Sequence, residues 1–135
     1  MKDAFAALES LSKLGKKEGD VKLGDLTLTL GTLDTDQESN VFISCAELTG
    51  NVYFYRLKIE TLKYSLKAVN EVRLDDYLRL EKVEDREKLK KETFDKIETI
   101  VKTWDENVVS YLYSEWAKLS KASEEELKSK GIIQE

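Results

Sequence analysis

The sequence contains no histidine, no proline and a single cysteine. Without histidine, the most frequent general base is missing, and one cysteine alone cannot complete the usual ligand set of a zinc site. Cys45 also has no partner for an internal disulfide, which is typical of a reducing compartment. We interpret Cys45, which lies in the apolar run VFISCAEL, as a small buried hydrophobic residue.

Long apolar runs are also missing. No stretch approaches the roughly 20 apolar residues that a membrane-spanning helix needs. The N-terminal segment MKDAFAALESLSKLGKK carries Asp3 and Glu9 within its apolar part, which predicts that it is not a secretory signal. The glycines are too dispersed for a phosphate-binding loop. We therefore expect a cytosolic protein that binds neither a membrane nor a nucleotide through these motifs.

Positive charge is not in excess, because 27 acidic residues face 22 basic ones and the formal net charge is −5. This balance argues against nucleic acid as a partner. The densest basic stretch, KLKK at 88–91, is bracketed by acidic residues and is typical of a solvated helix face. Acidic pairs such as Asp75-Asp76 lack the spacing of a calcium loop. We predict no catalytic, cofactor-binding or metal-binding residues, and the one catalytic alternative is an enzyme with two carboxylates remote in sequence.

The chain does contain enough apolar residues for one core. Its 135 residues are 41% hydrophobic and 36% charged, a mixture that favours amphipathic helices with solvated outer faces. We expect a mainly α (α+β) fold, a helical bundle with a small N-terminal β-hairpin. The predicted divisions are an N-terminal helical arm at 1–19, a single helical domain at 20–122 and a C-terminal tail at 123–135.

The arm and the hairpin have distinct patterns. Asp3 is a candidate cap of a first helix that ends near Gly15, and this short helix must dock on its own domain or on a neighbouring subunit. At 21–30, leucines and valine alternate with polar residues, which predicts two strands. The dipeptide Gly24-Asp25 between them predicts a two-residue hairpin turn.

After the hairpin, segments 36–48 and 52–69 are predicted to form a helical hairpin or one helix with a break, and two further helices are predicted at 86–103 and 106–120. Asp34 or Thr35 is the candidate cap of the segment at 36–48, and Asp105 is that of the helix at 106–120. The segment at 36–48 has an inner side of Val41, Phe42, Cys45 and Leu48. The segment at 52–69 has an apolar stripe of Val52, Tyr55, Ile59, Leu62, Leu66 and Val69. The segment 71–83 is ambiguous between a short helix and an extended connection. We expect helix 52–69 to pack against the last two helices.

The tail and the aromatic residues provide candidate contact surfaces. Ser123 and Glu126 have capping-box spacing, and Ile132 and Ile133 near the end are either a frayed tail or a hook onto a partner. Tyrosine and tryptophan are enriched in protein interfaces, although the edge of a core also accommodates them. Our candidate protein-interface residues are Phe5, Leu8, Phe54, Tyr113, Trp116, Ile132 and Ile133.

Three stretches carry a resemblance to a family. They are LGDLTLTLGTLDTDQE, YFYRLKIETLKYSLKAVNEV and TIVKTWDENVVSYLYSEWAKL, which together span about residues 21–119. In this order the chain resembles the small tail assembly chaperones and baseplate-hub proteins of bacteriophages. It departs from them at the bend after Trp104, where those proteins often carry proline and this chain has Asp105.

The resemblance implies a non-enzymatic bacteriophage tail protein, either an assembly chaperone or a structural hub or baseplate subunit. Its partners would be other tail or baseplate proteins, such as a tape measure or hub component, and self-association into a homo-oligomer is left open. It would occupy the host cytoplasm during assembly and, as a structural subunit, the virion tail. The alternative is a small regulatory binding protein, such as an antitoxin or anti-repressor, that dimerises through its long helices.

Overall fold

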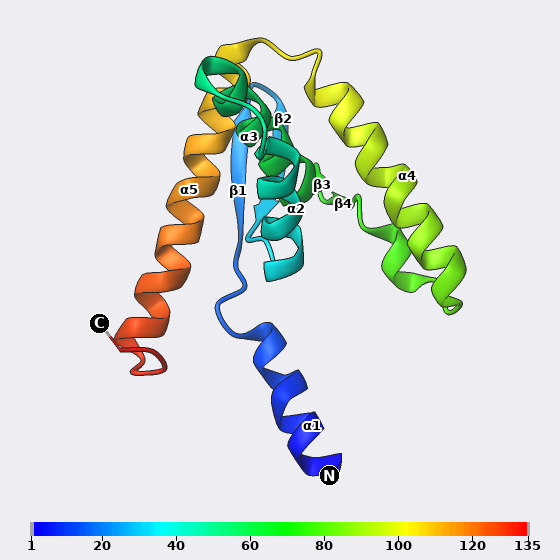
Figure 1. Ribbon diagram of the computed structural model, residues 1–135, viewed down its shortest axis with the longest axis vertical. Coiled ribbons are helices and arrows are strands. Elements are labelled where there is room, and N and C mark those ends of the chain that lie inside the picture. The colour runs from blue at the N-terminus through cyan, green and yellow to red at the C-terminus, as the bar shows by residue number, and fades with distance from the viewer. Residues whose placement is uncertain (1, 135) are drawn as a thin grey trace.

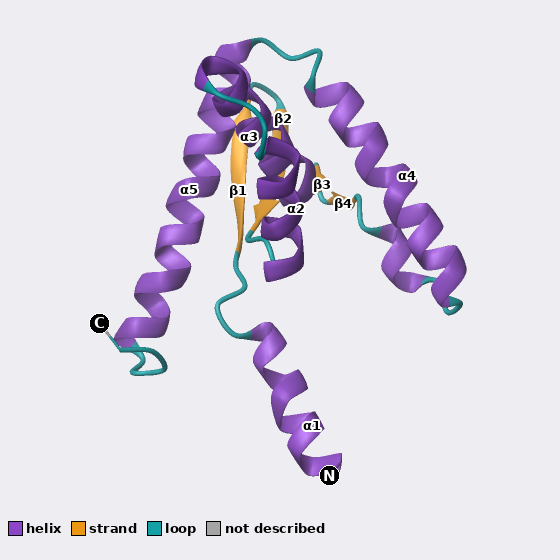
Figure 2. Ribbon diagram, viewed as in Figure 1, coloured by secondary structure: helices purple, strands orange, loops and turns teal. Residues whose placement is uncertain are grey.

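The computed structural model describes residues 2–134. It is mainly helical with a small antiparallel sheet, so the predicted mainly α (α+β) class is confirmed (Figures 1 and 2). The α-helices are α1 (Lys2–Ser10), α2 (Thr35–Cys45), α3 (Gly50–Ser65), α4 (Val83–Val101) and α5 (Glu106–Ser129). The strands are β1 (Glu18–Leu23), β2 (Leu26–Gly31), β3 (Leu66–Val69) and β4 (Val72–Arg73). Two short 3-10 helices are η1 (Leu11–Lys13) and η2 (Asp76–Arg79).

The sheet is an antiparallel meander in the order β1-β2-β3-β4. The predicted hairpin is confirmed, with Leu23 opposite Leu26 across the Gly24-Asp25 turn. Gly24 has a φ of +58°, which a glycine adopts without steric cost. The sequence interpretation missed β3 and β4, which continue the sheet beyond the hairpin because β3 pairs with β2.

The core lies where the sheet meets three helices. Side chains from β1 and β2 pack there with α3, β3, α4 and α5, and the fully enclosed members include Leu30, Leu62, Leu112 and Val101. Helix α3 packs against α4 and α5, as the sequence predicts. Burying large apolar side chains from distant parts of the chain is the main stabilising term for such a fold.

Local polar signals set the helix starts. Asp34 caps α2 through a hydrogen bond that its carboxylate accepts from the Gln37 N–H at 2.8 Å, and the Gln37 side chain completes the capping box. Asp105 starts α5 and accepts from the Asn107 N–H at 2.8 Å. The predicted break after Trp104 is therefore confirmed, and α4 and α5 diverge from that point (Figure 1).

Two predicted boundaries are wrong. The helix predicted at 52–69 begins at Gly50 and ends at Ser65, because Leu66 to Val69 join the sheet instead of continuing the helix. The predicted tail at 123–135 is helical as far as Ser129, so Ser123 lies within α5 and is not an N-cap. The ambiguous segment 71–83 contains strand β4 and the short helix η2.

The inner side predicted for α2 is also partly wrong. Val41 and Cys45 are buried, but Phe42 is 60% exposed. In the first helix, Asp3 lies within the first turn of α1 instead of before it. Across residues 2–134, every helix is either too short or too polar to span a bilayer.

Candidate functional site

Helix α1 forms an apolar arm that points away from the rest of the molecule (Figure 1). Phe5 and Leu8 are 59% and 63% exposed, and Leu11 and Leu14 continue the same line of exposed apolar side chains into η1 and beyond. The contacts of α1 within residues 2–134 are mainly with η1, the turn that follows it. We call residues 2–14 the arm.

The base of the arm is fixed to the body. The Ser123 hydroxyl of α5 donates to the carbonyl oxygen of Gly15, and Nζ of Lys17 lies 2.6 Å from Oε2 of Glu126. Gly15 follows the arm, has a φ of +76° and lies against Leu127 of α5. A glycine adopts this backbone conformation without steric cost, which allows the chain to turn between the arm and the body. The arm therefore leaves the body at a defined place.

A hollow lined by both apolar and polar side chains lies between the arm and the body. It has a volume of about 490 Å³ and is bordered by Leu11 and Leu14 on one side and by Leu33 and Leu127 on the other. A partner helix lying along the arm would reach this hollow and bury those leucines too. The arm and the hollow together form one candidate contact surface.

A second group of exposed apolar side chains surrounds the connection between α2 and α3. Its members are Phe42, Ile43, Val52, Phe54 and Tyr55. Phe54 is held by an edge-to-face contact with Tyr53, with ring centroids 5.4 Å apart. Exposed aromatic and aliphatic side chains of this kind are the anchors that protein interfaces use. We call these five residues the α2–α3 patch.

The remaining predicted interface residues are distributed differently. Tyr113 and Trp116 are only partly exposed, their rings lie 5.6 Å apart, and Trp116 packs against the core. Ile132 and Ile133 are exposed beyond the end of α5, where their N–H groups donate to the Leu127 carbonyl. The structure thus places Phe5 and Leu8 together, Phe54 in the separate α2–α3 patch, and Trp116 against the core.

The sequence interpretation missed Phe42 and Ile43 as surface residues. Both follow Val41 directly, and the segment was assigned a broad apolar side, whereas only Val41 and Cys45, four residues apart, face inward. The available signal was that few large apolar residues of α2 are spaced three or four residues apart, which indicates a narrow buried side.

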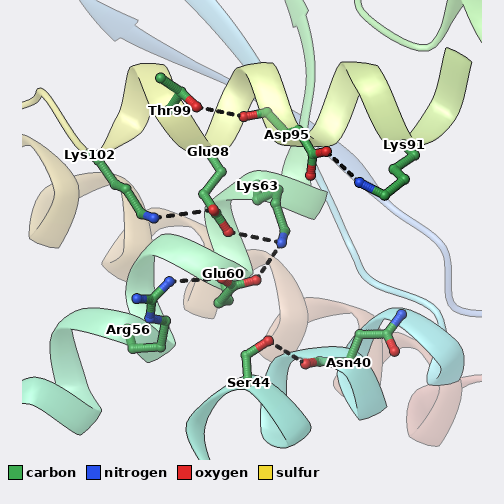
Figure 3. A network of polar contacts seen from close by, with 10 residues as sticks. All are labelled: Asn40, Ser44, Arg56, Glu60, Lys63, Lys91, Asp95, Glu98, Thr99 and Lys102. Atoms are coloured by element: carbon green, nitrogen blue, oxygen red, sulfur yellow. Dashed lines mark hydrogen bonds and ion pairs between the residues drawn. The ribbon is translucent and has the colours of Figure 1, made fainter.

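A buried glutamate of α3 belongs to an ion-pair network that reaches α4. Glu60 is only 2% exposed, and its Oε2 lies 2.5 Å from Nζ of Lys63, which also contacts Glu98 of α4 at 3.0 Å (Figure 3). Burial raises the pKa of Glu60, whereas hydrogen bonding to Glu60, together with Lys63 and Lys102, lowers the pKa of Glu98 to about 2. This network joins α3 to α4.

Cys45 is 1% exposed, and burial raises the pKa of its thiol, so the reactive thiolate is disfavoured. Within the described part of the chain, no three side chains among Cys, Asp and Glu are grouped so as to hold a metal ion.

Comparison of the chain with models of protein families, with curated proteins and with solved structures found no match. The candidate site accordingly rests on the residues and contacts of this chain.

Proposed function

We propose that this protein acts through protein–protein contacts made by the arm and that it performs no catalysis. The observation that carries the proposal is the exposed line of Phe5 and Leu8 on α1, continued by Leu11 and Leu14, in an arm that projects from the body. A helix of nine residues is marginal in water on its own, and a partner that covers the apolar face would stabilise it. The proposal makes the arm a helix that docks in a groove or beside a helix of another protein.

The size of the arm sets a limit on its affinity. Full burial of one large apolar side chain contributes roughly 1.5–3 kcal/mol, and these four are already about half buried, so each adds about 1 kcal/mol. A total of about 4 kcal/mol corresponds to a dissociation constant in the millimolar range before the costs of association. A useful complex therefore needs further contacts, and the hollow beside Leu127 and the α2–α3 patch supply apolar surface for them.

We further propose that the partners are tail or baseplate proteins of a bacteriophage, such as a tape measure or hub component. This narrower proposal rests on the resemblance in the three stretches between residues 21 and 119. The protein would act in the host cytoplasm during assembly, as a chaperone or as a subunit that then enters the virion tail.

The test is affinity capture from cells in which the phage assembles, with the captured proteins identified by mass spectrometry. The wild-type chain should capture a tail or baseplate protein, and the double variant Phe5→Glu/Leu8→Glu should lose it. The matched control is Ala6→Glu/Ser10→Glu, which adds the same two charges to exposed positions on the opposite side of α1 and should retain capture. Equal capture by the Phe5/Leu8 variant would refute the role of the arm.

The identity of the captured protein tests the narrower proposal separately. Capture of a toxin or a repressor through the arm would replace the tail proposal with the regulatory alternative. Mass spectrometry of purified virions then separates the two tail roles, because a structural subunit remains in the particle and a chaperone does not.

A further inference from the structure

A polar cavity on the body lies apart from the arm's apolar face and from the α2–α3 patch. It has a volume of about 310 Å³ and is bordered by the end of β2, the start of α2, β3, β4, η2 and α4. Five basic side chains line it: Lys16, Lys17, Lys67, Arg73 and Lys90. Three acidic side chains line it as well: Glu18, Asp34 and Asp75.

The three acidic groups already have partners. The Arg73 guanidinium donates to both carboxylate oxygens of Glu18 at 2.9 and 3.0 Å and to Asp75 at 2.7 and 3.2 Å. Hydrogen bonding to Arg73 holds the pKa values of Glu18 and Asp75 below their usual range. Asp34 is the cap of α2. These carboxylates are consequently occupied by groups other than the cavity's lysines.

Lys67 is a half-buried cation that lines the cavity. Its Nζ donates to the Tyr64 carbonyl oxygen at 2.9 Å, and within residues 2–134 no carboxylate lies within ion-pair distance of it. Burial is the main cause that lowers the pKa of Lys67, against the more distant charges of Asp75, Glu18 and Asp34. An ammonium group carries three N–H donors, so two are available to a ligand in the cavity.

The neighbouring backbone is shaped around this lysine. Gly31 at the end of β2 lies under the Lys67 side chain, and a Cβ atom at Gly31 would come within 2.7 Å of Lys67 Cε. The absence of a side chain at residue 31 therefore permits the course that Lys67 takes along the wall of the cavity. Lys16 and Lys90 add two more ammonium groups that form no ion pair within the described residues.

We propose that this cavity binds a small oxyanion, a phosphate or carboxylate group, through the ammonium groups of Lys67, Lys16 and Lys90. Charge-assisted hydrogen bonds to such a group supply the counter-charge that Lys67 lacks in the fold. Arg73 binds both Glu18 and Asp75, so neither carboxylate forms a direct ion pair with Lys67. The cavity shares Lys16, Thr32 and Asp34 with the hollow beside the arm, whereas no residue of the arm itself lines it.

The test is a titration of the full chain with inorganic phosphate and, separately, with acetate, at constant ionic strength, followed by backbone amide NMR shifts. Saturable shifts at Gly31, Thr32 and Lys67 are expected with at least one of the two probes, and the probe that saturates assigns the ligand class. Linear, non-saturating shifts with both probes would refute the proposal.

Three variants locate the site. Lys67→Met keeps most of the side chain's apolar stem and should weaken binding at least about tenfold, because one charge-assisted hydrogen bond is lost. Gly31→Ala keeps the charge but displaces the ammonium group, and it should weaken binding as well. The matched control Lys88→Met removes an exposed lysine of α4 that does not line the cavity and should bind as wild type does. Equal binding by Lys67→Met and wild type would also refute the proposal.

Discussion

The ammonium nitrogen of Lys63 on α3 lies 3.0 Å from Oε1 of Glu98 on α4 and joins the two helices. The same nitrogen lies 2.5 Å from Oε2 of Glu60, one turn earlier on α3. Arg56 and Lys102 complete the network from its two ends, with Arg56 on Glu60 and Lys102 on Glu98 (Figure 3). Glu60 is almost fully buried, so removing one of its cationic partners should cost more stability than removing a partner of an exposed carboxylate.

Replacing Lys63 by methionine should destabilise the protein by about 3 kcal/mol, because it leaves the Glu60 carboxylate buried with only Arg56 beside it. The free energy of unfolding, measured by urea denaturation at neutral pH, tests this expectation. The control is Lys91→Met, which breaks an exposed pair with Asp95 on α4 and should produce no measurable change. Equal effects of the two substitutions would contradict the structural role of Lys63.

The network also predicts how stability varies with pH. Glu60 has a raised pKa in the folded state, so the fold binds its proton more tightly and this residue costs stability as pH rises above the ordinary glutamate value. Glu98 has the opposite sign: its pKa of about 2 contributes stability that is present at neutral pH and lost as pH falls toward that value.

Glu60→Gln should therefore gain stability relative to wild type as pH rises from about 4 to about 7, because the amide cannot ionise. Glu98→Gln should lose stability relative to wild type as pH rises from about 2 to about 5, between the folded and the ordinary pKa of this carboxyl group. Urea unfolding of the three proteins at several pH values measures both differences. A stability difference that stays constant across the range given for a variant would show that its carboxyl group has no shifted pKa.

The turn between β3 and β4 offers a stabilising substitution. Asn70 and Glu71 have φ values of +49° and +71°, and a left-handed conformation costs a residue with a side chain roughly 1–2 kcal/mol. Asn70 is held in place, since its Oδ1 accepts from the Thr27 N–H at 2.8 Å. Glu71→Gly creates the Asn-Gly pair that such turns favour, and it should raise the free energy of unfolding by about 0.5–1 kcal/mol after the entropy of the unfolded glycine is deducted.

The matched control reverses the change at the other hairpin. Gly24 has a φ of +58°, and a Cβ atom there would meet no atom within 4 Å, so Gly24→Ala introduces backbone strain without a steric clash. It should lower the free energy of unfolding by about 1 kcal/mol. If both substitutions shift stability in the same direction, backbone strain is not the cause.

Local signals in the sequence predicted much of the fold. Alternation around Gly24-Asp25 predicted the hairpin, and the aspartates at 34 and 105 predicted the starts of α2 and α5. Each of these signals acts within a few residues along the chain. Their physical causes, a turn geometry and a capped N–H group, do not depend on distant partners.

The errors in predicting element boundaries arose where contacts between residues distant in sequence determine the local structure. Leu62 and Leu66 have helical spacing, but Leu66 pairs with Leu30 of β2, and the sheet pairing ends α3 at Ser65. That strand is also what brings Lys67 over Gly31, so the polar cavity had no sequence signal of its own. The arm was predictable as an amphipathic helix, whereas its separation from the body depended on tertiary packing that periodicity does not report.

A matched pair of leucine substitutions tests the independence of the arm. Leu62 is 0% exposed in the core, and Leu62→Ala should cost about 3–5 kcal/mol through lost burial and the cavity left behind. Leu8 is 63% exposed on the arm, so Leu8→Ala should change the free energy of unfolding by less than about 0.5 kcal/mol. Urea denaturation measures the free energy of unfolding of both variants, and the same substitution, leucine to alanine, is made at both positions. A cost above about 1 kcal/mol for Leu8→Ala would mean that the arm packs on its own body in solution, and its apolar face would then not be available to a partner.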